Sequence, residues 1–512
     1  MPSQWQTFPI EFRGGLISNM NPLQQGINMV GSATFLQNFE PSKEGGYKKV
    51  LGYEKFIAGS VAGTGPMLGV KVVNATDVIA VRRNGSDVSQ YYINSGAVWA
   101  SLGSAALLGN RVKAIDFNFD GTHKILFVDG VNSPAVFNDS TNTLSFPTLP
   151  ADLTGSEHVA LYKKAIFLAK GANLHFSAPY TETDFSAASG GGVINVGHSI
   201  TGLIVFRDQL IIFSRNKIQR LLGSSLADFQ LVPIADDIGC LHGETIQEVG
   251  GDVMFMAADG LRLLGATERI GDFGLEVASA PINKDALSFI NSTQTFASLV
   301  LREKAQYRVF AYSESVGTDV SKGLMGTKFS DQGAAAINWA TLSGFKIHVA
   351  DGRYVPGQEL TVFANADGYV YRLETGSSRD GGIIEAIYKS PFMPINDPQV
   401  RKTFYKLSLY VETQGTFAVD VNFDFDLFRT DNYTGGLANT IRLASDSAGV
   451  FVFGSPFAVF GSALYGAPLD NVYNTNVIGS GKTVSLRIED KTTNPSFSLD
   501  TAVLEFRTNE RK

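Results

Sequence analysis

The chain has 512 residues, carries a formal net charge of −7 and is 44% hydrophobic. This length allows two or more domains with a large buried core, and the apolar content excludes a mostly disordered protein. Acidic chains are poor candidates for binding nucleic acid tightly, because such binding depends on Lys and Arg side chains that neutralise phosphates. A surface past which DNA slides is still compatible with this charge.

The sequence has no run of about 18 apolar residues, and its start lacks a basic segment followed by an apolar one. We therefore expect neither a membrane span nor a secretory signal. The single cysteine, Cys240, excludes an internal disulfide framework and indicates synthesis in a reducing cytoplasm.

Residues 1–60 differ in pattern from the rest of the chain. Residues 8–12 alternate like a strand, glycines and prolines punctuate the next stretch, and the turn-rich run 38–53 leads into a further strand. We interpret 1–60 as an extended N-terminal segment, which in a closed propeller would complete the last blade. From residue 66, apolar runs separated by Gly turns predict a four-stranded group up to residue 102 and a second group over 111–146.

One pattern of sixteen residues then occurs three times. The copies are Tyr162–Ser177, Phe206–Leu221 and Val249–Leu264. Each contains an apolar run, a polar turn and a second apolar run, which predicts a hairpin. A strand repeat with a period of about 43 residues is typical of propeller blades, since one small sheet must stack on its neighbours to bury both faces. Strands predicted at 306–312, 345–349 and 360–373 continue the series around a Gly-rich insertion. The fold we expect is all-β, with a β-propeller of six or seven blades over residues 61–388.

A second domain is predicted over residues 389–512. It begins with the proline-rich stretch 390–398 and continues with longer strands at 403–412, 416–428, 483–490 and 502–508, which indicate a β-sandwich. Its charge-free loop, 448–468, is rich in Gly and Phe and is either buried under the sandwich or docked on another subunit. The aromatic residues that we assign to this subunit contact or gate are Phe453, Phe457, Phe460 and Tyr465.

One stretch matches the opening of a calcium loop, with oxygen ligands at alternate positions followed by Gly. These candidate ligands are Asp116, Asn118 and Asp120. The match then fails, because Phe127 occupies the position of the bidentate Glu. We favour a strand with Phe117 and Phe119 facing inward, closed by an Asp-Gly turn, and we expect no metal or other cofactor.

Two further patterns are candidate sites. Cys240 and His242 offer a thiol and a base, but a small buried thiol is the better interpretation. The strand 419–426 places four polar residues on one face, and these are Asp420, Asn422, Asp424 and Asp426. Such an acidic face is well solvated, binds cations, or lines an aqueous lumen in which it would repel DNA phosphates.

Three stretches resemble the structural tail proteins of short-tailed bacteriophages. They are the opening with Gly14-Gly15-Leu16 and residues 38–53, the run 126–139, and the blade-like stretch 238–264. The nearest likeness is to the tail nozzle, or tail tubular B, type. It implies a propeller-bearing subunit in a homo-oligomeric ring of six copies, which closes the tail tube below portal and adaptor proteins, next to tail fibres or spikes. Such a protein belongs to the virion tail, is made in the bacterial host cytoplasm, lets DNA pass without specific binding and has no catalytic activity. The chain is shorter than the larger nozzle proteins, so a hub or stabilisation role is also open.

A different class of function is also compatible with a propeller. A carbohydrate-binding or glycan-cleaving propeller involved in receptor recognition would present exposed aromatic residues beside paired carboxylates. Against it, the chain has only three Trp beside 36 Phe, and sugar platforms more often use Trp.

Overall fold

The computed structural model describes residues 5–225, 227–265, 277–292, 295–312, 322–331, 334–413, 415–426, 441–444 and 472–509. The α-helices in these ranges are α1 (Pro22–Asn28) and α3 (Asn283–Ile290), and nearly all other regular structure is β-strand. The predicted all-β class is therefore confirmed. Neither helix of the described ranges is long and apolar enough to cross a membrane.

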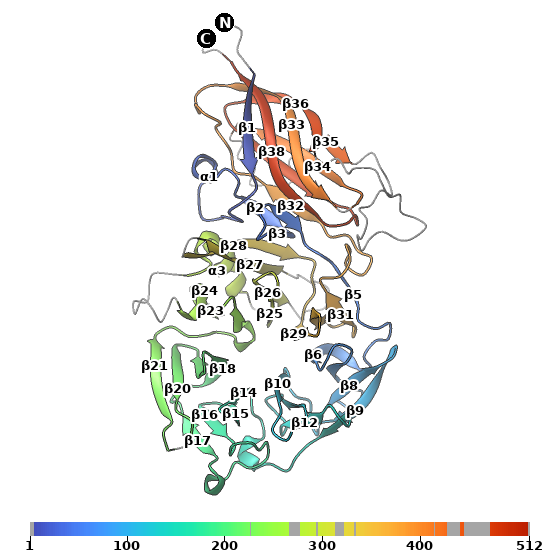
Figure 1. The fold of residues 1–512 in the computed structure, drawn as a ribbon, viewed down its shortest axis with the longest axis vertical. Helices are drawn as coiled ribbons and strands as arrows, with labels where there is room; N and C mark the ends of the chain where they lie inside the picture. The colour runs from blue at the N-terminus through green and yellow to red at the C-terminus, as the bar shows by residue number, and fades with distance from the viewer. Residues whose placement is uncertain are drawn as a thin grey trace.

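Most strands belong to small antiparallel sheets that follow one another around a common centre in Figure 1. The first two are β6 (Thr64–Val72), β7 (Val78–Arg83), β8 (Ser89–Ser95) and β9 (Val98–Ser104), then β10 (Lys113–Phe117), β11 (Lys124–Val128), β12 (Ala135–Asn138) and β13 (Thr143–Ser145). The next two are β14 (His158–Tyr162), β15 (Ala165–Lys170), β16 (Asn173–Phe176) and β17 (Gly192–Asn195), then β18 (Ile200–Phe206), β19 (Gln209–Ser214), β20 (Lys217–Leu222) and β21 (Gln230–Asp236). A three-stranded sheet comes next, with β22 (Gln247–Val249), β23 (Asp252–Ala257) and β24 (Gly260–Leu263). The last two units are β25 (Thr295–Leu301), β26 (Gln306–Tyr312), β27 (Lys322–Asp331) and β28 (Ala334–Ser343), then β29 (Val349–Val355), β30 (Gln358–Ala364) and β31 (Val370–Leu373).

The N-terminal segment completes the last of these sheets. Strand β5 (Tyr53–Lys55) pairs antiparallel with β31, with Tyr53 opposite Leu373. Strand β29 of this sheet contacts β6 of the first sheet, and the two share a buried cluster that contains Val72 and Val362. A strand that precedes the first sheet in the sequence thus completes the last one.

The three sequence copies are hairpins, as predicted. They form the pairs β15–β16, β19–β20 and β23–β24. The second and third residues of each copy form a turn in which both have positive φ, the geometry of a type I′ turn that suits the twist of the flanking strands. The turn residues are Lys163 and Lys164, Arg207 and Asp208, and Gly250 and Gly251.

One region was predicted wrongly. Strands β27 and β28 lie where we expected a Gly-rich insertion, and they pair over ten residues each. Their Ala, Gly and Lys residues have low strand propensity, so pairing with β26 and with each other overrides the local preference. The strand expected at 345–349 begins instead at Val349, although Phe345 and Ile347 are buried as core residues.

Two larger sheets pack on each other at the C-terminal end of the chain (Figure 1). One contains β1 (Gln6–Glu11), β3 (Phe39–Pro41), β4 (Tyr47–Lys49), β38 (Phe497–Thr508), β33 (Lys402–Thr413) and β36 (Val472–Gly481). The other continues from β28 through β2 (Phe35–Gln37), β32 (Ala386–Lys389), β37 (Val484–Asp490), β34 (Ala418–Phe425) and β35 (Ile441–Ala444) to make a nine-stranded sheet. Between the two sheets, the rings of Phe404 and Phe425 lie 5.5 Å apart.

The first 55 residues interlock these parts. They supply β1, β3 and β4 to the six-stranded sheet, β2 to the nine-stranded sheet and β5 to the ring of small sheets. Strand β32, at the predicted boundary near residue 389, pairs with β2 on one side and with β37 on the other. The nine-stranded sheet therefore joins the ring to the C-terminal sheets without a break.

Candidate functional site

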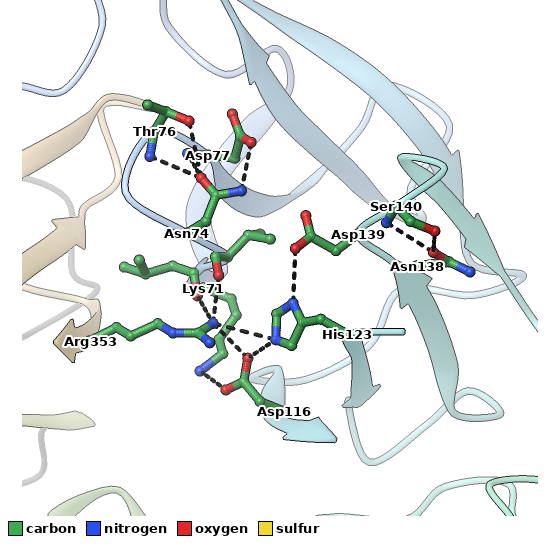
Figure 2. A network of polar contacts seen from close by, with 12 residues as sticks. Lys71, Asn74, Thr76, Asp77, Asp116, His123, Asn138, Asp139, Ser140 and Arg353 are labelled. Carbon is green, nitrogen blue, oxygen red and sulfur yellow. Dashed lines mark hydrogen bonds and ion pairs between the residues drawn. The ribbon is translucent and has the colours of Figure 1, made fainter. Parts of the chain in front are cut away.

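The first strands of the small sheets bring a cluster of charged side chains together near the ring centre (Figure 2). Asp116 on β10 is its hub. Its Oδ2 lies 2.9 Å from Lys71 Nζ on β6, and its Oδ1 accepts a hydrogen bond of 2.9 Å from the guanidinium of Arg353 on β29. Lys71 also reaches Asp351 of β29 at 3.4 Å. One carboxylate thus links three different sheets.

A histidine extends this cluster toward the outside of its own sheet. His123 Nε2 lies 2.9 Å from Asp116 Oδ1, and its Nδ1 lies 3.0 Å from Asp139 Oδ2. His123 immediately precedes β11, and Asp139 immediately follows β12. The Asp139 amide donates to the carbonyl of His123, so main chain and side chains hold the same pair of residues together.

Two turns beside the cluster are each held by the side-chain oxygen of an Asn residue. Asn74 Oδ1 accepts from the amides of Thr76 and Asp77, each at 2.9 Å, in the turn between β6 and β7. Asn138 Oδ1 accepts from the amide of Ser140 at 3.0 Å, just after β12. Asn favours such turns because its side chain mimics a backbone acceptor. Both are visible beside the cluster in Figure 2.

The charges of the cluster stabilise one another. Burial alone would raise the pKa of Asp116, but Lys71 and Arg353 outweigh burial and hold that pKa below its ordinary value. Burial alone would lower the pKa of Lys71, but Asp351 and Asp116 outweigh it and raise the pKa. Both groups are therefore charged at neutral pH.

A second group of charges crosses the ring centre itself. Arg111, just before β10, donates to the carbonyl of Phe296 on β25, and Lys113 Nζ lies 3.2 Å from Glu244 Oε1 in the turn before β22. Lys113 also lies 2.7 Å from Nδ1 of His158 on β14. The contacts of Arg111 with Phe296 and of Lys113 with Glu244 connect sheets that are not neighbours in the ring, whereas His158 belongs to the adjacent sheet. The cavity they leave has a volume of about 140 Å³.

A third group joins the N-terminal segment to the ring. The buried guanidinium of Arg308 lies 3.1 Å from Glu40 Oε2 and 2.8 Å from Glu374 Oε1. Lys304 makes ion pairs with the same two carboxylates. Burial would raise the pKa of Glu374, but Arg308 and Lys304 outweigh it and lower that pKa to about 2.

A fully buried ion pair ties the N-terminal segment to the C-terminal sheets. Lys49 Nζ on β4 lies 2.7 Å from Asp490 Oδ2 on β37 and also donates to the carbonyl of Thr492. Because a buried charge is costly unless paired, this contact fixes the position of β4 against the opposite sheet.

The structure separates the predicted calcium ligands. Asp116 is held by the cations described above, Asp120 lies 2.9 Å from Lys124, and Asn118 is exposed. The rings of Phe117 and Phe119 lie 5.1 Å apart and pack in one apolar cluster. Within the ranges that the structure describes, no group of three or more His, Cys, Asp or Glu side chains could hold a metal ion.

The alternation predicted for 419–426 is present in β34 as far as Phe425, and Asp426 follows the strand with a positive φ of 58°. The polar face is not purely acidic. Asp424 lies 2.9 Å from Lys389, Asp426 lies 3.1 Å from Arg401, and Asp420 lies 3.8 Å from Arg442. Asn422 lies opposite Arg487 of β37 in the strand pairing. The cations that neutralise this face come from β32, from β35 and from the start of β33, so the residues of β34 alone could not reveal them.

Two other predicted sites have clear outcomes. Cys240 is buried, its sulfur lies 3.2 Å from the carbonyl oxygen of His242, and burial raises the pKa of the thiol to about 11. The ring of His242 packs against Phe296 instead, with centroids 4.6 Å apart. The aromatic residues predicted as a subunit contact lie outside the described residues, and these are Phe453, Phe457, Phe460 and Tyr465.

Comparison with known proteins adds no identification: no protein-family model and no curated protein matches this sequence. The geometry therefore carries the functional argument. The charged clusters of this chain connect strands that are far apart in the sequence, and sequence reasoning missed them. The one local signal was a pair of charged residues two positions apart, as in Asp351 and Arg353 or in Arg111 and Lys113.

Proposed function

We propose that this protein is a structural subunit of a short bacteriophage tail, a nozzle or hub protein whose copies form a closed ring of about six around the DNA path. In this proposal the small sheets are the seven blades of a β-propeller, closed by β5, and the two C-terminal sheets are a β-sandwich. Portal and adaptor proteins would lie above the ring, with fibres or spikes beside it.

The proposal rests on the position of the charged residues, which pair across sheets. The clusters around Asp116, Glu244, Glu374 and Asp490 each join different sheets. Ion pairs between elements resist their separation, which suits a subunit that bears load. An enzyme would instead direct perturbed titratable groups into an open cleft.

The continuous sheet supports the same function. The nine-stranded sheet runs from β25 in the ring to β35 at the C-terminal end, and the N-terminal segment adds strands to both parts. Force applied to one part is therefore transmitted through backbone hydrogen bonds rather than through a flexible linker.

The path of DNA in this proposal lies between subunits. The centre of each subunit is crossed by Arg111 and Lys113, and the cavity there, of about 140 Å³, is far smaller than a duplex. We retain the polar face of β34 as the candidate lumen surface. With its carboxylates paired to Lys and Arg, this face would neither grip nor strongly repel phosphates.

The mass of the purified protein in solution, measured by native mass spectrometry at several concentrations, tests the proposal. A closed ring of about six copies supports it, because a conduit requires cyclic closure. A chain that stays monomeric both alone and when mixed with purified portal and adaptor proteins would contradict it.

A second candidate function rests on a groove between the last sheet of the ring and the six-stranded sheet. The groove has a volume of about 1000 Å³ and is lined by polar residues that include Glu54, Glu412 and Asp500. Burial and the nearby Glu412 raise the pKa of Asp500. Its size matches that of ligand pockets, so a carbohydrate-binding or glycan-cleaving protein is the alternative. Binding to a glycan array that Asp500→Asn abolishes would favour this alternative over the tail subunit.

A further inference from the structure

The cavity at the ring centre carries an unbalanced charge. Strands β6, β10, β25 and β29 and the turn before β22 line it. Among the described residues that form its wall, the charged side chains are Arg111, Lys113 and Glu244. Two cations thus face one carboxylate at a partly buried site.

Neighbouring groups do not supply the missing negative charge. His158, which accepts a hydrogen bond from Lys113, has its pKa lowered to about 3 by burial and by that ammonium, so it is neutral. In the adjacent cluster, Asp116 and Asp351 pair with Lys71 and Arg353, and Asp139 lies against His123. None of these three carboxylates is among the residues that line the cavity. The cavity therefore keeps one positive charge in excess.

Glu244 already forms an ion pair with Lys113 and lies near Arg111. Its Oε1 lies 3.2 Å from Lys113 Nζ, and its pKa, which burial would raise, is held below the ordinary value by Lys113 and Arg111. The side chain of Glu244 is 31% exposed although it lies inside the ring, because it faces the cavity. There is thus open space directly beside the two cations.

We propose that this cavity binds one small monovalent inorganic anion, of which chloride is the simplest. Arg111 and Lys113 are partly buried, so a counter-charge beside them is favourable, and an anion would complete their pairing. The cavity, at about 140 Å³, has room for an ion with a few waters. Gluconate, a much larger organic anion, serves as the reference.

The donors for such an anion come from two places, the segment at the start of β10 and strand β22. Arg111 has five N–H donors and gives one to the carbonyl of Phe296. Lys113 has three, directed in part to Glu244 and His158. The side-chain amide of Gln247 on β22 also faces the cavity and donates to the carbonyl of Ser298. An anion held here would join sheets on opposite sides of the ring and stabilise its closure.

The experiment is calorimetric unfolding of the full chain at pH 8 and constant ionic strength, with sodium chloride replacing sodium gluconate. At this pH a histidine of ordinary pKa is neutral, so His158 cannot replace a deleted cation. We expect chloride to raise the Tm of the wild type in a saturable manner. The matched control is Lys217→Met, which removes a lysine from an exposed ion pair with Asp236 on the rim and should leave the chloride response unchanged.

Two variants change the net charge of the cavity wall in opposite directions. Lys113→Met should abolish the chloride-dependent rise, because the excess positive charge is gone. Glu244→Gln keeps the shape of the side chain and removes the competing carboxylate, so the chloride concentration for half-maximal effect should fall about tenfold or more. A chloride response that is absent in the wild type, or that is equal in the wild type and Glu244→Gln, would overturn the proposal.

Discussion

Replacing Asp116 by Asn tests whether the central cluster holds the sheets together. Asn keeps the shape of the side chain but removes the charge that faces Lys71 and Arg353. Breaking a buried ion pair from one side costs about 3–5 kcal/mol, and the cost falls when solvent screens the pair. The side chain of Asp116 is 32% exposed and that of Lys71 is 13% exposed. We therefore expect a loss of about 2 kcal/mol in the free energy of unfolding.

The assay is calorimetry of Asp116→Asn beside the wild type at neutral pH. With an unfolding entropy of about 2.1 cal/mol/K per residue, a chain of this length loses about 2 °C in Tm. The matched control is Asp236→Asn, because Asp236 pairs with Lys217 at 2.9 Å but its side chain is 64% exposed. A pair of that kind contributes at most about 1 kcal/mol. The double variant with Lys71→Met should cost less than the sum of the two single changes.

Equal Tm values for Asp116→Asn and Asp236→Asn would refute this reasoning. So would strict additivity of Asp116→Asn and Lys71→Met, because residues in one ion-pair network are expected to couple. Either result would mean that the closure of the ring depends on apolar packing between the sheets and on β5 alone.

Two further predictions concern the contacts between sheets. Glu374→Gln should cost about 3 kcal/mol, because it leaves the buried Arg308 and Lys304 with one carboxylate, Glu40, in place of two. The folded pKa of Glu374 is about 2, below its ordinary 4.5, so its stabilisation is complete above pH 4.5 and is lost as the pH falls toward 2. The Tm difference between wild type and variant should therefore shrink over that interval. Gly202→Ala should cost about 1–3 kcal/mol by overpacking, because a Cβ there would lie 2.3 Å from Cδ1 of Ile246 in the next sheet. Ile246→Val removes that methyl, so the double variant should lose less stability than the two single variants lose together. Urea unfolding measures these free energies. Single effects that simply add in the double variant would contradict the clash.

The hairpin repeats show what local pattern could predict. The apolar run Leu210–Phe213, its polar turn and the next apolar run form β19 and β20 because a strand buried on both faces needs only apolar residues and a turn. The same reasoning located β6–β9, the strands of 403–412 and 483–490, and the alternation of β34. It missed β27, whose glycines and lysines acquire a strand conformation only from pairing with β26.

The candidate site could not be predicted in the same way. Asp116 reads locally as part of an Asp-x-Asn-x-Asp-Gly turn, and only the ring brings Lys71, Arg353 and His123 to it. The polar face of β34 likewise looked acidic because Lys389 and Arg401 belong to other strands.

By itself, the sequence determined the all-β class, the repeated hairpins and the positions of most strands, because these depend on periodicity and turn chemistry over a few residues. The tertiary structure decided the rest. The pairing of Tyr53 with Leu373, the buried contact of Lys49 with Asp490 and the charges that cross the ring centre all join residues separated by large parts of the chain. Such pairings depend on which surfaces meet when the sheets pack, and no local pattern encodes that.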